Sequence, residues 1–375
     1  MPHTNIGDPR ALLDELERWV IIETPTSDAA RVNALMDFAV GGLAEAGVAL
    51  TRIPGRDGYG DNSIARINER PGVKPILVVG HLDTVWSTGT LGTMPFRVDG
   101  DRAYGPGIFD MKAGSFAAVY AVREIARQRV TTKRPITLLL TPDEEVGSPT
   151  SRAIIEAESA EAALALIPEA AGPGGVCVTA RKGVGRFTLQ VRGVGSHAGS
   201  AFGDGASAVV ELAHQILRLH GMVDPSRGIT LNVAPIQGGS RPNVIAAEAT
   251  AEIDLRVVSA ADGERMTALI LGLQPVDPRC RLTVTGGMNR PPMERTRPIA
   301  ALFRHASTLA AELGFPLTEA ATGGGSDGNF TAALGVPTLD GMGGVGEGAH
   351  ASHESVVLKS LVPRTTLLAE MIRTS

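Results

Sequence analysis

The chain has 375 residues, of which 43% are hydrophobic and 4% aromatic, and its 35 basic and 40 acidic residues give a net charge of −5. A chain of this length usually exceeds what one hydrophobic core holds, so we expect two domains. The slightly acidic, evenly spread charge argues against a nucleic-acid partner or an anionic membrane surface.

Neither a membrane segment nor a disulfide framework is visible in the sequence. No apolar run approaches the roughly 20 residues that a membrane helix needs, and the first residues lack the basic and apolar regions of a signal peptide. Cys177 and Cys280 form no metal-binding or disulfide pattern. We therefore expect a cytoplasmic protein, while noting that a trimmed leader would leave the same sequence.

The first part of the chain alternates between helical and strand patterns. Apolar spacing predicts helices over residues 11–20, 32–46, 113–127 and 151–157, and strands over 64–67, 76–79, 136–140 and 163–167. Strands that alternate with helices are typical of an α/β domain, with a mostly parallel sheet covered on both faces.

The pattern changes near residue 180. The stretch "GRFTLQVRGVGSHAG" alternates polar and apolar residues, as a half-exposed strand does. Further strands are predicted over 229–236, 247–258 and 281–285, with helices over 205–220 and 261–272. From about Pro292 the α/β pattern returns, with a helix over 298–313 and a short apolar run at 336–339. We expect residues 1–181 and 292–375 to form one α/β domain, interrupted by a smaller α+β domain of residues 182–291.

Polar residues follow the predicted strands of the α/β domain. Ligand sites in open α/β sheets lie at the carboxyl ends of strands. The residues placed there, or just before the helix at 113–127, are His81, Asp83, Asp110, Asp143, Glu144, Glu145, Glu169, His350 and His353. So many carboxylates would repel one another unless a cation neutralised them, so this edge is predicted to bind metal.

The ligand types indicate which metal and which chemistry. Histidine and carboxylate together suit zinc, with cobalt or manganese as possible substitutes. More ligands than one ion needs indicate two ions about 3.5–4 Å apart, bridged by a carboxylate. Glu144 and Glu145 are adjacent, so one is expected to ligate while the other handles a proton. A metal-bound water and a carboxylate base are what metal-assisted hydrolysis requires.

The ordered motifs "GHLDTV", "GPGIFDMKAG", "TPDEEVGS", "PEA", "GSHAG", "GGGSDGNF" and "GAHASHE" resemble those of the M20 family of di-zinc metallopeptidases, most of all its glutamate carboxypeptidase branch. The resemblance covers nearly the whole chain. It implies a zinc-binding α/β domain interrupted by a lid domain that forms a homodimer.

Carried over by position, the resemblance assigns each residue of the site. It implies that His81 and Glu169 bind one zinc ion, that Glu145 and His350 bind the other, and that Asp110 bridges the two ions. Glu144 is implied to be the general base. Asp83 is implied to orient His81. It also implies a cis peptide bond between Asp110 and Met111.

The histidine ligand near the C-terminus has two candidates. The family pattern places glutamate four residues after the ligand and an aliphatic residue two further on. His350 fits, with Glu354 and Val356, whereas His353 does not. We therefore predict His350 as the ligand and His353 as a surface residue.

Other motifs relate to the substrate. By resemblance, His197 in "GSHAG" reaches into the active site of the partner subunit and donates to the oxyanion, which makes the dimer part of catalysis. The residues implied to hold the substrate's free carboxylate and nearby polar atoms are Asn243, Arg256, Arg290, Gly324, Gly325 and Ser326. Arginine suits this task because it binds carboxylates with two hydrogen bonds. The alternative for Arg256 is a solvated ion pair with Asp254.

These features together predict a metal-dependent amidohydrolase that releases a C-terminal amino acid, glutamate first, from a small peptide or an N-acyl amino acid. Glu169 favours this branch, since aminopeptidase and dipeptidase relatives tend to carry aspartate there. An N-acyl-amino-acid deacylase of the same family would share every catalytic residue. A non-catalytic protein that binds metal or peptide is the third reading, and Glu144 argues against it because binding alone does not need a base.

Overall fold

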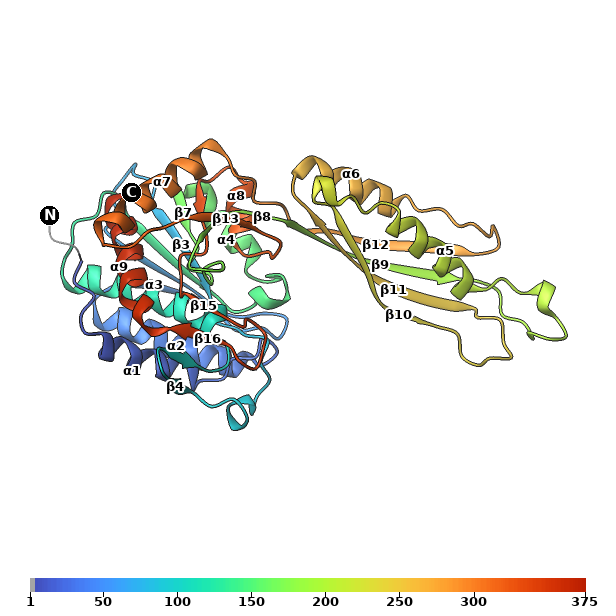
Figure 1. Ribbon diagram of the computed structural model, residues 1–375, viewed down its shortest axis with the longest axis horizontal. Helices are drawn as coiled ribbons and strands as arrows, with labels where there is room; N and C mark the ends of the chain where they lie inside the picture. The colour runs from blue at the N-terminus through green and yellow to red at the C-terminus, as the bar shows by residue number, and fades with distance from the viewer. Residues whose placement is uncertain (1–3) are drawn as a thin grey trace. The chain divides into compact units, whose positions relative to one another are not determined.

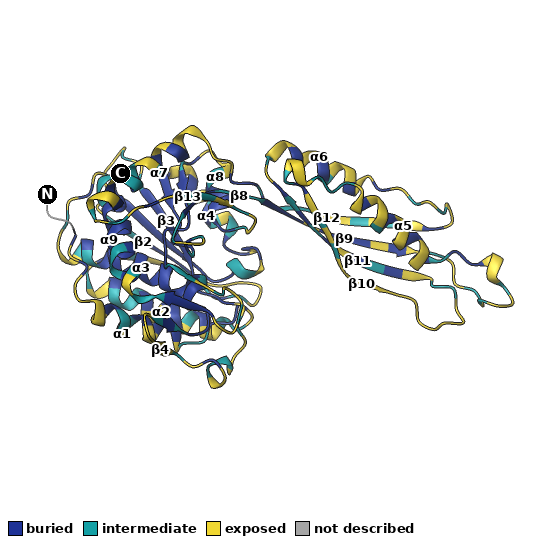
Figure 2. Ribbon diagram, viewed as in Figure 1, coloured by how far each residue is buried: buried dark blue, intermediate teal, exposed yellow. Residues whose placement is uncertain are grey.

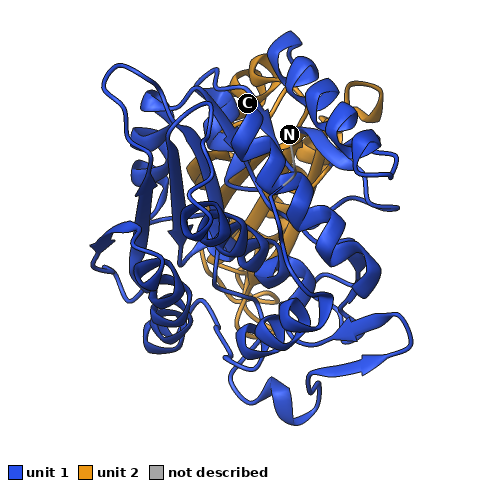
Figure 3. Cartoon of the chain, turned by 90° about the vertical axis from the view of Figure 1, so that its left-hand side faces the viewer, with its two compact units in different colours: residues 1–180, 295–322, 326–375 blue, residues 181–294, 323–325 orange. Residues whose placement is uncertain are grey.

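The computed structural model describes residues 4–375, which fold into two compact units (Figure 3). Unit 1 comprises the described residues up to Ala180 together with 295–322 and 326–375. Unit 2 comprises 181–294 and 323–325. The predicted insertion, 182–291, lies within unit 2, and the three glycines at 323–325 group with it.

Unit 1 is built on a six-stranded sheet with the strand order β1-β2-β6-β3-β7-β14. The strands are β1 (Ala49–Ile53), β2 (Asn62–Ile67), β3 (Ile76–His81), β6 (Ile136–Thr141), β7 (Leu164–Leu166) and β14 (Thr338–Leu339). The neighbours from β6 to β14 pair in parallel, whereas β1 and β2 are added in antiparallel fashion. The predicted α/β class with a mostly parallel sheet is therefore confirmed.

Helices cover both faces of this sheet. This is seen in β3, whose residues are all buried although successive residues point to opposite faces of the sheet. Ile76 and Val78 pack into a core with α1 (Pro9–Val20), α2 (Ala29–Glu45), α3 (Ala113–Arg127), α7 (Arg297–Glu312) and α9 (Leu358–Thr374). Leu77 and Val79 pack into a second core with α4 (Arg152–Glu161) and α8 (Gly328–Ala333). Figure 1 shows these helices around the sheet of unit 1.

Short elements complete unit 1. They are the four-stranded sheet of β15 (Gly346–Glu347), β16 (Ser355–Val357), β5 (Arg102–Tyr104) and β4 (Arg97–Asp99), the pair β13 (Glu319–Thr322) and β8 (Cys177–Arg181), and the helical turns η1 (Thr90–Gly92), η2 (Ile108–Lys112) and η3 (Glu144–Val146). The segments next to η2, η3 and β16 carry the site described below.

Unit 2 is a four-stranded antiparallel sheet with two helices on one face. The strand order is β10 (Thr230–Gly238), β11 (Glu248–Val257), β9 (Gly183–Arg192) and β12 (Arg281–Arg290). Alternate residues of β9 and β11 are buried against α5 (Ala208–His220) and α6 (Ala260–Leu271). The resulting alternation of buried and exposed residues along these strands is visible in Figure 2. The turns η4 (Phe202–Asp204) and η5 (Pro225–Arg227) complete the unit.

All the predicted helices and strands are present, with ends shifted by a few residues. The structure also contains helices and strands that were not predicted. Among these are the edge strand β1, the short strands of the small sheet and the helix α9. Within residues 4–375, no helix is both long enough and apolar enough to cross a membrane.

Candidate metal centre

His81 ends β3, and the residue two positions further on fixes its ring. The Nδ1–H group donates to the backbone carbonyl of Asp83 at 3.0 Å, and the Oδ1 atom of Asp83 lies 3.3 Å from the same nitrogen. The carbonyl of His81 in turn accepts the hydroxyl of Ser115, on α3, at 2.7 Å. These contacts direct the Nε2 atom of His81 toward the other candidate ligands.

Asp110 lies in η2, and its peptide bond to Met111 is cis, as the resemblance implied. Its Oδ1 atom is 3.4 Å from Nε2 of His81, and its Oδ2 atom is 3.2 Å from Nε2 of His350. One carboxylate thus faces two imidazoles that come from distant segments of the chain. This is the arrangement that a carboxylate bridging two ions requires.

Two groups of three candidate ligands share Asp110. His81, Asp110 and Glu169 form one group, and Asp110, Glu145 and His350 form the other; within each group the ligand atoms lie within 4.8 Å of one another. Glu169 Oε1 is 3.8 Å from His81 Nε2, and Glu145 Oε2 is 3.3 Å from His350 Nε2. The five residues predicted to ligate metal are therefore brought together in the grouping that the resemblance implied.

Asp83 positions the two adjacent glutamates as well as His81. Its carboxylate accepts the backbone N–H groups of Glu144 at 3.1 Å and Glu145 at 3.2 Å, and the hydroxyl of Thr26 at 2.7 Å. Glu144 Oε2 lies 4.0 Å from His81 Nε2. Glu144 is therefore beside the candidate ligands without belonging to either group of three, which suits a proton-transfer role.

The residues present fit a divalent cation. Nε2 of His81 and Oε1 of Glu145 are buried and have no hydrogen-bond partner among residues 4–375. A buried polar atom without a partner is costly, so such atoms call for an unseen partner. Two imidazole nitrogens and three carboxylates make a mixed nitrogen and oxygen set that suits zinc, cobalt or manganese.

Electrostatics in the metal-free cluster agree with this fit. Burial acts to lower the pKa of His81, but the neighbouring carboxylates of Asp110, Asp83 and Glu169 hold that pKa well above its ordinary value. Asp110 and Glu145 raise the pKa of His350 to about 10. Without metal, protons on the two imidazoles therefore neutralise part of the carboxylate charge, and a cation would take over this task.

Two residues near the site in sequence lie outside it in space. Asp143 accepts hydrogen bonds from the hydroxyl and N–H of Thr150, both at 2.6 Å, and from Ser151, so it holds the turn that leads into α4. Burial raises the pKa of its carboxyl group. His353 is exposed and belongs to neither group of ligands. Adjacency to the motif had placed Asp143 among the strand-end carboxylates, but its side chain points to the loop instead.

Some residues that support the site were missed in the sequence. Lys112 is buried, and its ammonium group donates to the carbonyls of Ile22 at 2.6 Å and Val20 at 3.4 Å. Burial lowers the pKa of Lys112 to about 7. The position of Lys112, two residues after Asp110, could have indicated its role from the sequence. Thr26, which donates to Asp83, stands in no motif that could have indicated its role. Glu354 was noticed only as part of a spacing pattern.

His197, in unit 2, presents a defined tautomer. Its Nδ1 atom accepts the backbone N–H groups of Gly199 and Ser200, both at 3.1 Å. Because Nδ1 is the acceptor, the proton of the neutral ring is on Nε2, which is then a hydrogen-bond donor. Asn243 is exposed nearby, and its backbone carbonyl accepts the backbone N–H group of Ala198 at 3.0 Å.

Three arginines contact the glycine segment 323–325 of unit 2. Arg256 forms an ion pair with Asp254 through two hydrogen bonds of 2.7 and 2.9 Å, which was the alternative to a substrate-binding role. It also donates to the carbonyl of Gly323. Arg181, which was not predicted, donates to the carbonyls of Gly324 and Gly325 at 3.4 and 3.3 Å. Arg290 is buried, and a Cβ atom added at Gly325 would lie only 2.8 Å from its Cδ atom.

Ser326, which lies in the predicted substrate loop, belongs to unit 1. It is buried, its hydroxyl donates to Asp340 and its N–H group donates to Asn329. These bonds hold the loop at this point.

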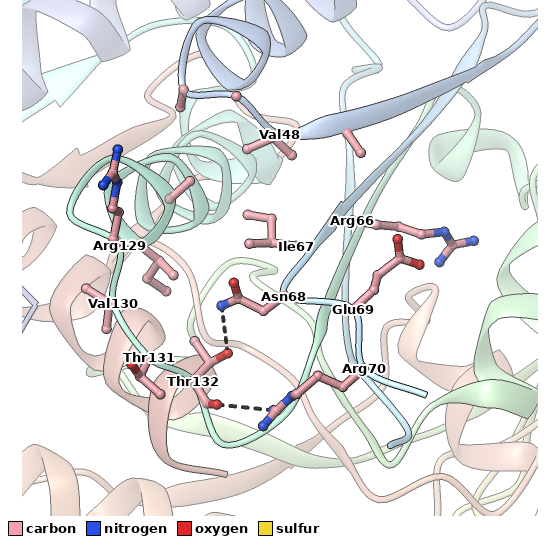
Figure 4. Close-up of a pocket in the computed structure, with 15 residues that line it drawn as sticks. Val48, Arg66, Ile67, Asn68, Glu69, Arg70, Arg129, Val130, Thr131 and Thr132 are labelled. Carbon is pink, nitrogen blue, oxygen red and sulfur yellow. Dashed lines mark hydrogen bonds between the residues drawn. The ribbon is translucent and has the colours of Figure 1, made fainter. Parts of the chain in front are cut away.

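A cavity of about 570 Å³ lies elsewhere in unit 1 (Figure 4). Its lining includes Ile67, at the end of β2, and residues 129–132, which precede β6, so it lies at the end of β6 away from Glu144 and Glu145. Asn68 and Arg70 in this lining bond to Thr132. None of the predicted site residues lines it.

Comparison with known proteins gives a family match over most of the chain. Residues 77–374 match the model of peptidase family M20/M25/M40. Carboxypeptidase G2 of Pseudomonas sp. (strain RS-16) is 32% identical over 365 residues, which cover 96% of this chain and 88% of that protein. Acetylornithine deacetylase of Myxococcus xanthus is 28% identical over 253 residues, or 63% of this chain and 64% of that protein.

Solved structures share the fold. Aminopeptidase PepT from Bacillus cereus superposes with a TM-score of 0.77 at 20% identity, covering 98% of this chain and 99% of that one. The YXEP protein of Bacillus subtilis, described as a dinuclear metal-binding peptidase, has a TM-score of 0.70 at 16% identity and covers 97% of each chain.

Proposed function

The chain belongs to peptidase family M20/M25/M40 and is a hydrolase of that family, and on this basis we propose that it cleaves the amide bond to a C-terminal amino acid, with glutamate as the first candidate. The observation that carries the proposal is the pair of ligand groups that share Asp110, with Glu144 beside them. The similarity to carboxypeptidase G2 over 96% of the chain supports the carboxypeptidase branch.

Two zinc ions are the proposed cofactors, with cobalt or manganese as substitutes, held by His81, Asp110, Glu145, Glu169 and His350. Bound there, they would polarise the scissile carbonyl and lower the pKa of a water molecule. Glu144 would accept the proton of that water and pass it to the leaving amine. Asp83 would keep both glutamates and His81 in position through its backbone and ring contacts.

Substrate recognition is proposed to come from unit 2. Arg290, Arg256 and Asn243 would hold the free carboxylate and neighbouring polar atoms, since guanidinium groups bind carboxylates in a planar, two-bond geometry. His197 would donate its Nε2–H group to the developing oxyanion in the partner subunit of a homodimer.

A second candidate function is the deacylation of N-acyl amino acids, which the similarity to acetylornithine deacetylase favours. The two functions share the free α-carboxylate and the scissile amide, and they differ in which side chain and which acyl group the protein accepts.

The test is a hydrolysis screen with mass detection. The panel contains N-acyl amino acids with acidic, basic and apolar side chains, the same compounds with an amidated carboxyl group, and short peptides with a free N-terminus. We expect cleavage only when the carboxylate is free, fastest for glutamate. Chelation should abolish the activity, and zinc or cobalt should restore it. Equal cleavage of the amidated compounds, or full activity in protein shown to be metal-free by elemental analysis, would refute the proposal.

A further inference from the structure

Glu354 is a fully buried carboxylate that accepts four N–H groups. Its Oε2 atom accepts the indole N–H of Trp86 at 2.7 Å and the backbone N–H of Gly107 at 2.8 Å. Its Oε1 atom accepts the backbone N–H groups of Phe109 and Asp110, both at 2.9 Å. Both oxygens are thus engaged, and three of the four donors belong to the loop that carries Asp110.

That loop depends on an outside acceptor. Gly107 has a φ of +70°, and a Cβ atom there would lie 2.3 Å from Thr84, so the chain turns sharply just before η2. The N–H groups of residues 107, 109 and 110 converge on one point rather than on a sheet or helix partner. Buried N–H groups need acceptors, and a carboxylate can serve several at once.

Glu354 links three segments that carry candidate ligands, two through its side chain and one through its backbone. Trp86 follows His81 in the loop after β3, and the N–H group of Glu354 donates to the carbonyl of Ala351, next to His350, at 2.9 Å. Glu354 therefore contacts the segments of His81, Asp110 and His350. Each of the two ligand groups contains Asp110 and one of these histidines.

We propose that Glu354 is a positioning residue for the bimetal centre: it fixes Asp110 between His81 and His350, so that one carboxylate can bridge two ions. Its carboxylate faces backbone and indole N–H groups, so it acts through Asp110 and touches neither metal nor substrate. The inference rests on the metal centre proposed above and is independent of which amide the protein cleaves.

Glu354→Gln is the direct test, because the amide has nearly the shape of the carboxylate. Whichever way the amide turns, its NH₂ group faces two N–H donors, so two of the four hydrogen bonds are lost. Substitution of residues that orient metal ligands typically costs about 10–100-fold in metal affinity. We expect a loss of this size in cobalt affinity, together with an altered visible absorption spectrum of the dicobalt protein.

Glu211→Gln is the matched control. Glu211 is also a buried glutamate that accepts backbone N–H groups, those of Val276 and Asp277, but it lies in unit 2. The same substitution there should lower thermal stability while leaving cobalt affinity and the absorption spectrum unchanged. The control thus separates general destabilisation from an effect on the ligands.

The measurements are cobalt titrations of metal-free full-length protein, the absorption spectrum and the melting temperature. Wild-type affinity and spectrum in Glu354→Gln would overturn the proposal. If that variant does not fold, Trp86→Phe decides, because it removes one donor and leaves the three backbone bonds; we expect a loss in affinity of about fivefold, and unchanged affinity would overturn the proposal. The titrations need no substrate, so a failed hydrolysis screen would leave this result standing, whereas a wild-type protein that binds fewer than two ions would refute the metal centre itself.

Discussion

The two units treat their functional side chains in opposite ways. In unit 1 four of the five candidate ligands are buried or partly buried and His350 is exposed, and Asp83, with its bonds to Thr26, Glu144 and Glu145, shows how firmly the cluster is held before any ion arrives. In unit 2, His197 and Asn243 are exposed on loops and Arg256 is already paired with Asp254. All the candidate metal ligands thus belong to unit 1, whereas the roles proposed for the groups of unit 2 concern the substrate alone.

This contrast predicts that substitutions in unit 1 change metal content and that those in unit 2 change kinetics alone. Glu144 is the informative exception. Glu144→Ala should keep both ions and lower kcat by about 10²–10⁴-fold, because only the proton acceptor is removed. Glu145→Ala should lose one ion or bind it with lower affinity, because a ligand is removed. Elemental analysis and steady-state kinetics on both variants check this, and the opposite pattern would mean that the roles of the two glutamates are exchanged.

His197→Ala should lower kcat by about 10²–10³-fold, the usual cost of one oxyanion donor, with unchanged metal content. Mixing His197→Ala protein with Glu144→Ala protein tests action across a dimer. If His197 serves the partner, a mixed dimer has one site with both groups and one with neither, so activity returns. A mixture that stays inactive despite demonstrated subunit exchange would show that His197 acts within its own subunit or not at all.

The two arginines should differ. Arg290→Lys keeps the charge but loses the planar two-bond geometry, and we expect KM to rise by roughly 10–150-fold, equivalent to about 1.5–3 kcal/mol. Arg256→Lys should have a smaller effect, since Asp254 already occupies its guanidinium group. Comparing KM and kcat for the two variants checks this order, and equal effects would mean that Arg256 leaves Asp254 when substrate binds.

The smallest expected effect is the dependence of metal binding on pH. The pKa of His350 in the metal-free protein is about 10, above its ordinary value of 6.5, so at neutral pH the ring holds a proton that the metal must displace. Metal affinity should therefore rise by roughly tenfold per pH unit for each proton displaced. The stability that the protonated ring gives the metal-free fold is present below the unfolded pKa and is lost as the pH rises through about 10.

Chelator competition at several pH values, and proton release in weakly buffered solution, measure this prediction. His197→Ala should leave the pH dependence of metal affinity unchanged, because His197 belongs to unit 2. An affinity that did not vary with pH would contradict protonation of the ligands in the metal-free protein.

Much of the fold and of the metal centre could be predicted because the signals are local. A continuous buried run such as Ile76–Val79 indicates a central strand, and the polar residues that follow it fall at one edge of the sheet whatever the rest of the chain does. The grouping of the ligands came from the ordered motifs rather than from periodicity.

What could not be predicted depends on distant partners. The four donors to Glu354 lie 244 to 268 residues away in sequence, so no local pattern reveals them. Helix α9 contains Pro363 and buried polar residues, among them Arg364 and Glu370, which break the apolar periodicity and are satisfied only by tertiary contacts. Asp143 was misplaced for a different reason: its partners Thr150 and Ser151 are close in sequence, and its side chain turns toward them rather than toward the candidate ligands.

The interruption of unit 1 sets the order of events during protein synthesis. A ribosome makes His81, Asp110 and both glutamate ligands, then almost all of unit 2, and only afterwards strand β14 and the loop that carries His350. Domains tend to fold as units while the chain emerges. The sheet of unit 2 is contiguous in the chain and can therefore form while unit 1 still lacks its last parallel strand and its last ligand. Under the proposed ligand assignment, loading of both ions is consequently one of the final steps of maturation, because His350 is made after the other four ligands.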